Sequence, residues 1–302
     1  MVEYRLPKPG VVGSSPIARS LFLFLGTFMT KKKWRLIIDG VPAGGAWNMA
    51  VDEFLFRSLA DEPVTYLRFY GWERPTASLG FGQATVQVVD LEFCRRNGVD
   101  VVRRLTGGKL VLHDREVTYA VVSSDVETFT STLGGSYLRI SQGLVKGLEA
   151  FGLKPVLAAE TPRDYVKGTM PCFSHPARNE IELDGRKIIG SAQKRIGDRF
   201  LQHGSIPLAG DENLLREVSL RKGDPSIIFM TSLSEALGRP VGFAEAVDRF
   251  IEGFASCGGI EFEPFSFRNE ERAAIEDLRR RKYATEAWTI DGRATDPPAA
   301  CS

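Results

Sequence analysis

Residues 180–208 read EIELDGRKIIGSAQKRIGDRFLQHGSIPL, and this stretch decides the fold. Asp184-Gly185 lies between two runs rich in apolar residues, which is a strong signal for a tight two-residue hairpin. Gly197-Asp198 provides a second turn shortly afterwards. The stretch therefore predicts three consecutive antiparallel strands, at Glu180–Leu183, Arg186–Gln193 and Phe200–Leu208.

The middle strand of the three carries a lysine among apolar residues. Regular alternation would divide it between two faces, with Lys187, Ile189 and Ser191 on one and Arg186, Ile188 and Gly190 on the other. A lysine followed by two isoleucines is drawn inward, where its charge must be paired or used. The alternative is an ordinary strand lysine whose stem lies along the surface. The small residues Gly190-Ser191-Ala192 are typical of a backbone that lies close to a ligand or another strand.

The rest of the chain alternates between strand and helix patterns. Short apolar runs bounded by Gly or Pro predict strands at Trp34–Asp39, Val64–Tyr70, Thr76–Phe81, Val99–Arg104, Leu110–Leu112 and Val117–Ser123. Apolar residues at three- and four-residue steps predict helices at 47–58, 137–151 and 243–254. Asp90 and Asn269 stand where N-caps of two further helices are expected. Periodicity disappears between residues 161 and 176, which predicts a loop.

These elements predict an α+β fold with mixed or antiparallel sheets flanked by helices, and a small helical appendage at the C-terminus. Residues 30–230 form the predicted main domain and residues 231–290 a helical extension. Residues 291–302, which contain Asp-Pro-Pro-Ala-Ala, are expected to be a disordered tail. Residues 1–29 are expected to be a disordered arm, or to reflect a gene start placed too early, with Met29 as the initiator.

Composition excludes several classes of function. The chain has 302 residues, 43% of them hydrophobic, and a formal net charge of +1, which gives no case for a general nucleic-acid or membrane-surface binder. Leu21–Met29 is about half the length that spans a bilayer. The four cysteines and three histidines lack metal-ligand spacing, so neither a metal site nor a disulfide framework is expected. This cysteine pattern suits a reducing cytoplasm.

A glycine-rich segment, Arg103-Arg104-Leu105-Thr106-Gly107-Gly108-Lys109, lies between two predicted strands. Paired glycines let backbone N–H groups approach a ligand closely, and arginines suit a phosphate or carboxylate. The alternative is a glycine hairpin with solvated basic residues. His113 follows the next apolar run and is either a site residue or a hydrogen-bonded structural histidine.

Cys172 lies in the segment Met170-Pro171-Cys172-Phe173-Ser174-His175-Pro176. Prolines on both sides favour an extended backbone, and the segment leads directly into the hairpin. A cysteine close to a lysine has the ingredients of a low-pKa thiolate, because an ammonium group stabilises the thiolate form. The alternative is a structural cysteine. Cys94, Cys257 and Cys301 have no comparable setting.

Taken together, several segments resemble the biotin/lipoate ligase and octanoyltransferase superfamily. The segments that carry the resemblance are Trp47–Glu53, Arg68–Trp72, Arg103–Gly108, Val111–Asp114, Asp184–Gln193, Leu201–Ser205 and Lys282–Trp288. They follow in order from Trp34 to Trp288, and the combination is far more specific than any single motif. The resemblance implies the catalytic fold of that superfamily and makes residues 30–230 an acyltransferase domain.

Cys172 separates two activities within the superfamily. Lipoate ligases activate free lipoate with ATP, whereas octanoyltransferases pass an octanoyl group through a cysteine. Cys172 precedes Lys187 by 15 residues, as in octanoyltransferases that act on the glycine-cleavage H protein. The resemblance thus implies Cys172 and Lys187 as catalytic residues. It implies substrate binding by Arg104, Thr106, Gly107, Gly108, His113, Gly190, Ser191 and Ala192.

The resemblance also implies partners and leaves alternatives open. Octanoyl-acyl carrier protein would be the donor, a lipoyl domain or the H protein the acceptor, and the enzyme a cytoplasmic monomer without a cofactor. His113 and His203 are candidate bases for the acceptor amine, and Lys109, Arg103, Lys194 and Arg195 a candidate basic rim. Lys109-Leu110 departs from the family pattern, and Leu110 is expected to narrow the acyl tunnel or to shift the loop, which leaves the chain-length preference open. The alternatives are an ATP- and Mg-dependent lipoate–protein ligase, a lipoyl amidotransferase and an inactive acyl-binding protein.

Overall fold

A computed structural model describes residues 31–157, 180–210, 212–220 and 230–292 of the chain. The chain from Lys31 onward clusters as one compact unit. The predictions for residues 1–29, for Cys172 and for the tail beyond residue 292 lie outside the described residues.

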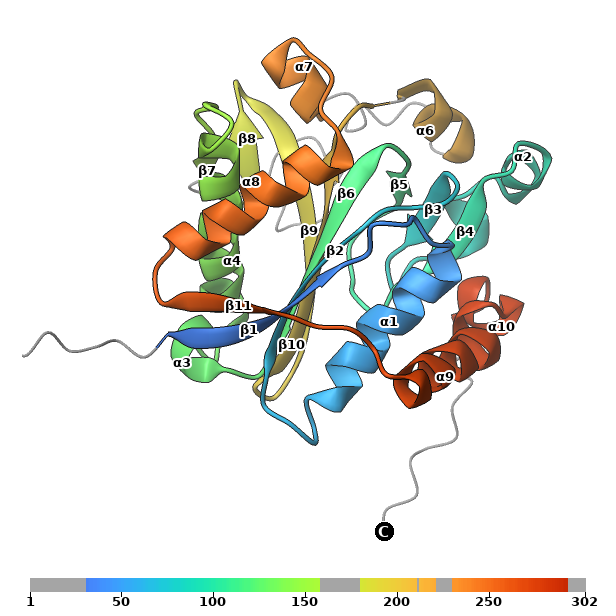
Figure 1. Cartoon of the computed structure of the whole chain (residues 1–302). Helices are drawn as coiled ribbons and strands as arrows, with labels where there is room; N and C mark the ends of the chain where they lie inside the picture. The colour runs from blue at the N-terminus through green and yellow to red at the C-terminus, as the bar shows by residue number, and fades with distance from the viewer. Residues whose placement is uncertain (1–30, 158–179, 211, 221–229, 293–302) are drawn as a thin grey trace, which may run out of the picture. The chain divides into compact units, whose positions relative to one another are not determined.

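The described elements are runs of strands interrupted by helices (Figure 1). The strands are β1 (Lys32–Ile38), β2 (Thr65–Tyr70), β3 (Thr76–Leu79), β4 (Asp100–Arg103), β5 (Val111–His113), β6 (Glu116–Ser123), β7 (Val156–Leu157), β8 (Ile181–Leu183), β9 (Arg186–Ile196), β10 (Arg199–Pro207) and β11 (Ile260–Pro264). The helices are α1 (Gly45–Ser58), η1 (Thr85–Gln87), α2 (Leu91–Arg96), α3 (Val126–Phe129), α4 (Leu133–Glu149), α6 (Glu212–Val218), α7 (Leu233–Leu237), α8 (Phe243–Ser256), α9 (Asn269–Leu278), η3 (Arg279–Tyr283) and α10 (Glu286–Thr289).

The larger of the two sheets has eight strands in the order β11-β1-β2-β6-β10-β9-β8-β7. β1 pairs in parallel with both β11 and β2, and the strands from β2 to β7 pair antiparallel. Parallel neighbours cannot be joined by a tight hairpin, so α1 connects β1 to β2. This mixed sheet, flanked by helices, confirms the predicted α+β class.

Turn chemistry explains the order of β8, β9 and β10. Asp184 and Gly185 have φ values of 50° and 74°, as a two-residue hairpin turn that matches the strand twist requires. Gly197, with φ of 57°, closes the second turn. The three antiparallel strands predicted from residues 180–208 are therefore confirmed.

Helices cover both faces of the larger sheet, as Figure 1 shows. On one face, α4 and α8 pack over alternate residues of β2 and β6 such as Leu67 and Val121. On the other face, α1, α9 and α10 pack over the intervening residues, Tyr66 and Ala120 among them. Alternation along these central strands thus divides the interior into two cores.

The smaller sheet has three strands in the order β4-β3-β5 and its own core. α2 packs beside it and begins where predicted, because the Asp90 side chain accepts a hydrogen bond of 2.8 Å from the Phe93 N–H. The glycine loop, defined here as residues 104–109, connects β4 to β5. This sheet therefore places the glycine loop beside the larger sheet.

The C-terminal part contains a strand that the sequence prediction missed. β11 completes the edge of the larger sheet beside β1, whereas only helices were expected there. β11 does alternate apolar and charged residues, from Ile260 to Glu263, but it is only five residues long and lies between predicted helices, so the alternation was not recognised. The predicted cap of α9 is also wrong: Arg268 precedes the helix and its N–H donates to Glu271 at 2.7 Å, so Asn269 is the first helical residue.

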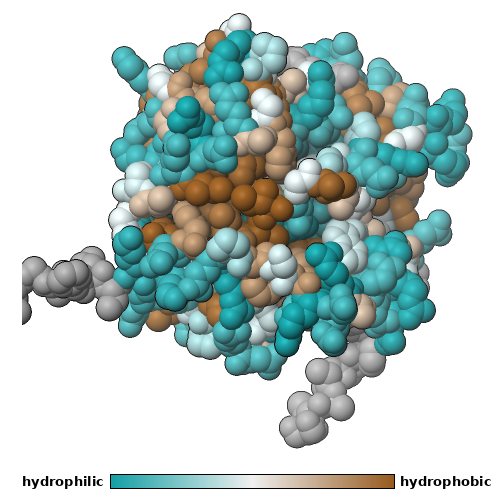
Figure 2. All heavy atoms as spheres, viewed as in Figure 1, coloured by the Kyte–Doolittle hydropathy of each residue, from teal (hydrophilic) through white to brown (hydrophobic). Residues whose placement is uncertain are grey.

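The face seen in Figure 2 is largely hydrophilic, with hydrophobic side chains gathered in a strip across its middle. Among the described residues, no helix is both long enough and apolar enough to cross a membrane.

Close packing of α4 against α8 makes a testable prediction. An ideal Cβ on Gly147 would lie 2.3 Å from the Phe250 ring, whereas one on Gly134 of the same helix would meet nothing within 4 Å. Gly147→Ala should lower the free energy of unfolding in urea by about 1–3 kcal/mol through overpacking. Gly134→Ala should leave it unchanged or raise it by up to about 1 kcal/mol. Equal stabilities would contradict the packing described.

Candidate active site

A cavity of about 130 Å³ is lined by both sheets. This volume approaches the ~150 Å³ of an apolar cavity that holds benzene. Seven of the predicted site residues line it: Arg104, Gly108, His113, Lys187, Gly190, Ser191 and Ala192. Apolar and aromatic residues complete its wall, among them Met49, Tyr70, Trp72 and Val111. Segments far apart in the sequence therefore meet at one concave site.

A bulge in β9 decides which side chains face this cavity. Neighbouring residues of β8 pair with Lys187 and Ile189 of β9, so Ile188 is an extra residue. Such a bulge reverses the alternation beyond it. Lys187 and Gly190 therefore share a face, and an ideal Cβ on Gly190 would lie 3.5 Å from Lys187 Cε. The predicted grouping of Lys187 with Ile189 is wrong, since Ile188 and Ile189 both lie in the core.

Lys187 is held by a buried ion pair. Its Nζ donates to Glu180 Oε1 at 2.7 Å, and each side chain is only 10% exposed. Glu180 also lines the cavity and stands at the start of the hairpin. The expectation that the charge of Lys187 is paired is thus confirmed, and the alternative of an ordinary surface lysine is wrong.

Arg104 shapes the glycine loop. Its Nη2 donates to the carbonyls of Gly107 at 3.0 Å and Lys109 at 2.7 Å, and its Nη1 to that of Ser78 at 2.7 Å. Burial lowers the pKa of Arg104 to about 10. Both Nη atoms of Arg104 donate hydrogen bonds to backbone carbonyls, so the guanidinium positions the loop.

The loop leaves two backbone donors without acceptors. Within the described part of the chain, the N–H groups of Gly107 and Gly108 have no hydrogen-bond acceptor. A carbonyl and the following N–H point in opposite directions in a trans peptide, so the Gly108 N–H points away from Arg104. Gly108 has φ of 93°, and an ideal Cβ on Gly80 would lie 2.0 Å from its carbonyl oxygen. Both positions therefore require glycine.

Thr106 is fully buried and does not line the cavity. Its Oγ1 lies 2.7 Å from His203 Nε2. His203 Nδ1 in turn lies 2.8 Å from Asp52 Oδ2, and Arg68 donates to Asp52 Oδ1 at 2.9 Å. Both nitrogens of His203 are therefore already hydrogen-bonded, which makes it a poor candidate base for a substrate amine.

His113 belongs to a second buried network. Glu116 accepts from His113 Nδ1 at 2.8 Å and from Ser205 Oγ at 2.6 Å. Although burial opposes ionisation, the charge of His113 and these hydrogen bonds hold the pKa of Glu116 below its ordinary value. The His113 ring stacks on Trp72 with centroids 4.0 Å apart, and Trp72 Nε1 donates to Thr118 at 2.7 Å. His113 is thus both hydrogen-bonded and part of the cavity wall.

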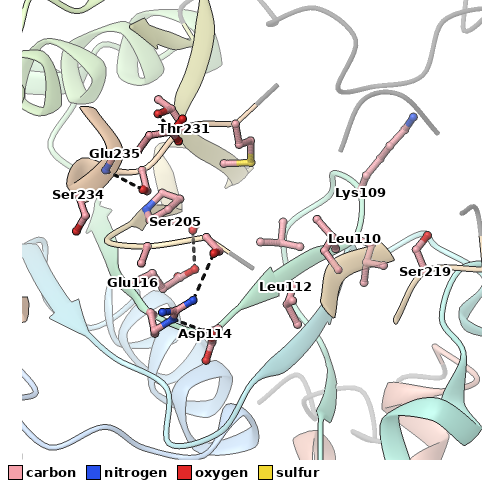
Figure 3. Close-up of a pocket in the computed structure, with 18 of the residues that line it drawn as sticks. Lys109, Leu110, Leu112, Asp114, Glu116, Ser205, Ser219, Thr231, Ser234 and Glu235 are labelled. Carbon is pink, nitrogen blue, oxygen red and sulfur yellow. Dashed lines mark hydrogen bonds and ion pairs between the residues drawn. The ribbon is translucent and has the colours of Figure 1, made fainter. Parts of the chain in front are cut away.

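A second cavity, of about 880 Å³, adjoins the first (Figure 3). It shares Lys109, Val111, Ser205 and Met230 with the smaller cavity. Leu110 lines only the larger one. Leu110 therefore does not line the cavity around Lys187, and the expectation that it narrows the acyl tunnel or shifts the loop stays a prediction.

Arg103 does not belong to a basic rim. The residue is 2% exposed, and its guanidinium donates to the carbonyls of Trp288 at 3.0 Å and Gln83 at 2.7 Å. It also donates to Thr85 Oγ1 at 2.7 Å. Arg103 therefore joins the loop after β3 to the C-terminal residues. Lys194, by contrast, lies 5.3 Å from the ring of Phe81, which is 48% exposed.

Sequence reasoning missed several residues of this site. Tyr70 and Trp72 fall within a segment that carried the resemblance, so their position in a motif was a usable signal. Glu116 and Glu180 were missed although His113 and Lys187 are only three and seven residues away, because no sequence pattern marks these pairs as buried contacts. Cys172 lies outside the described residues. Among the residues that the structure describes, no group of three or more His, Cys, Asp or Glu is placed to hold a metal ion.

Comparisons with known proteins identify the family of the chain. The model of the lipoyl protein ligase A/B catalytic domain matches residues 45–255. The chain belongs to this family and is an acyltransferase enzyme. It is 38% identical over 283 residues to octanoyltransferase LipM of Geobacillus kaustophilus, covering 87% of this chain and 99% of that protein. It is 34% identical to octanoyltransferase LipM of Bacillus subtilis, with 86% and 99% covered.

Solved structures share the fold. Lipoate-protein ligase A bound with ATP has a TM-score of 0.72 and 23% identity, with 87% of this chain and 100% of that chain covered. A bipartite lipoate protein ligase from Thermoplasma acidophilum has a TM-score of 0.69 and 22% identity, with 88% and 99% covered.

The Glu116 network predicts a pH-dependent stability. Glu116→Gln should lower the free energy of unfolding at pH 7 by about 1–3 kcal/mol, because donors that face a carboxylate would meet an amide. The lowered pKa of Glu116 means that its stabilisation is present above the ordinary value of 4.5 and is lost as pH falls through the folded value. The difference between parent and variant in urea should therefore shrink below pH 4.5. The exposed strand variant Glu261→Gln is the control, and a pH-independent difference would contradict the argument.

Proposed function

We propose that this enzyme transfers an octanoyl group from acyl carrier protein to a lysine of a lipoyl domain or of the glycine-cleavage H protein. The observation that carries the proposal is one cavity that joins Lys187, the glycine loop and an apolar wall. The 34% and 38% identity to octanoyltransferases over nearly their whole length supports the same acyl group.

The apolar wall suits the acyl chain. Gly190 lies at the Lys187 end of the cavity, and the register of β9, β10, β6 and β2 leads from Gly190 through Ser205 and Thr118 to Tyr70. The chain would extend in this direction toward Met49 and Trp72. Burying about seven methylene and methyl groups is worth several kcal/mol, at roughly 0.8 kcal/mol per CH₂.

The proposed nucleophile is Cys172. Its distance along the chain from Glu180 is eight residues, which span at most about 28 Å, so chain connectivity lets it reach the cavity. The Lys187 ammonium at the cavity wall would favour the thiolate form of Cys172. Glu180 holds that ammonium at 2.7 Å, so the pair fixes the position of the positive charge.

Two acyl transfers complete the proposed reaction. The Cys172 thiolate attacks the octanoyl thioester carbon, a new C–S bond forms, and the donor leaves as a thiolate that takes up a proton. The acceptor amine then attacks the acyl-enzyme, loses a proton, and releases the Cys172 thiolate as the amide forms. The N–H groups of Gly107 and Gly108, which lack acceptors among the described residues, would stabilise the tetrahedral oxyanion.

A basic, partly apolar surface next to the cavity suits an acidic carrier protein. Lys109 lines the cavity, and Lys194 lies beside the exposed ring of Phe81. Such charges steer association and set orientation more than they add affinity.

The first test is intact-protein mass after incubation with octanoyl-acyl carrier protein and no ATP. The parent should gain one octanoyl group that hydroxylamine removes, and Cys172→Ala should gain none. Cys257→Ala is the matched control, because its half-buried thiol is outside the site, and it should behave as the parent.

Other outcomes of this assay favour other activities. No adduct in any variant, with transfer from free lipoate that requires ATP, would establish a ligase instead. Acylation only from a lipoylated protein donor would establish an amidotransferase. A folded protein inactive in all three assays would be an acyl-binding protein.

The role of Lys187 makes a second prediction. Lys187→Ala should slow alkylation of Cys172 by iodoacetamide at pH 7 by roughly tenfold, the change expected if the thiol pKa rises by about one unit. Lys146→Ala, which removes a surface lysine on α4, should not change the rate. Equal rates for all three proteins would exclude lysine-assisted thiolate formation.

A further inference from the structure

We propose that Asp52, His203 and Thr106 form a buried hydrogen-bond relay that positions the glycine loop over the cavity. This inference deepens the proposed function, because it rests on the glycine loop as the acyl-binding element. It assigns the three side chains as positioning residues, and none of them as a group that reacts with substrate.

The relay crosses three separate parts of the fold. Asp52 comes from α1, His203 from β10 and Thr106 from the glycine loop. The contacts are 2.8 Å between Asp52 Oδ2 and His203 Nδ1, and 2.7 Å between His203 Nε2 and Thr106 Oγ1. All three residues are buried. The loop is therefore tied through one side chain to the larger sheet and to the helix behind it.

Proton positions in the relay follow from its neighbours. Arg68 and Tyr70 both donate to the Asp52 carboxylate, so Asp52 is an ionised acceptor and His203 Nδ1 must carry a hydrogen. Burial lowers the pKa of His203 despite the opposing effect of Asp52, so the ring is neutral at pH 7. A neutral ring with hydrogen on Nδ1 has a lone pair on Nε2. Thr106 must therefore donate its hydroxyl hydrogen to His203.

The order of these groups matches a nucleophile–base–acid triad, but the burial of Thr106 excludes that role. Thr106 is 0% exposed and does not line either cavity. The hydrogen bond from Thr106 to His203 can instead hold the loop backbone in place. The Thr106 carbonyl accepts from the Phe81 N–H at 2.8 Å, and the next two residues carry the N–H groups without acceptors. A shift of Thr106 would therefore move both of those donors.

Thr106→Val tests the relay, because valine keeps the shape of threonine and removes the hydroxyl. Its kcat/KM for octanoyl transfer should fall between about 10-fold and 100-fold, the range expected when a reacting geometry is displaced without loss of a reacting group. Exchange of the Phe81 amide hydrogen should become faster. Thr106→Ser, which restores the hydroxyl, should recover both.

Thr65→Val is the matched control. Thr65 Oγ1 lies 2.7 Å from Ser123 Oγ in another buried hydroxyl pair on the larger sheet. Its loss should reduce stability without changing kcat/KM or Phe81 exchange. Equal effects of the two valine variants, or no effect of either, would overturn the proposal.

A measurement on the parent protein covers the case in which Thr106→Val does not fold. Nitrogen-15 spectra of the His203 ring should show hydrogen on Nδ1 and a lone pair on Nε2 at pH 7. Hydrogen on Nε2 would overturn the relay. If the parent does not transfer octanoyl, only the proposed function is overturned. The exchange rate of the Phe81 amide and the tautomer of His203 test the relay independently of that activity.

Discussion

The ion pair between Arg68 and Asp52 is the interaction on which the site depends. The Arg68 side chain is fully buried in β2, and it donates to Asp52 and Asn48 of α1 and to Asp39 at the end of β1. Removing one partner of such a pair costs about 3–5 kcal/mol, because the other charge stays buried. The pair therefore fixes α1 on the sheet, and Asp52 then orients the histidine that contacts the glycine loop.

Local signals predicted much of the fold, and long-range pairing accounts for what they missed. The turn at Asp184-Gly185 could be predicted because a two-residue hairpin requires residues that tolerate positive φ. The bulge at Ile188 had no such signature, since its position depends on register with β8. Arg103 looked like a surface base by composition, yet its guanidinium is buried between the carbonyl of Gln83 and that of Trp288, which is 185 residues away. The role of Glu116 likewise depends on His113 and Ser205, which the fold places beside it.

Glycines permit close backbone contacts within each of the two sheets, and their loops, that form the site. Gly80 permits contact with the Gly108 carbonyl, and Gly204 of β10 has no room for a Cβ beside the Gly190 carbonyl. Backbone close approach of this kind leaves polar groups that need partners. Arg104 supplies them for the loop carbonyls, whereas the N–H groups of Gly107 and Gly108 have no acceptor among the described residues. In the proposed reaction these two donors stabilise the tetrahedral oxyanion.

The place of β11 in the sheet has a consequence for biosynthesis. β1, near the beginning of the described chain, pairs with β11, which begins more than two hundred residues later. The guanidinium of Arg103 can likewise donate to the carbonyls of Trp288 and Thr289 only after those two residues have been synthesised. Contacts of such sequence separation slow folding, because a long loop must close before they form. During synthesis from the N-terminus, the hydrogen bonds that anchor Arg103 can therefore be complete only after α10 has left the ribosome.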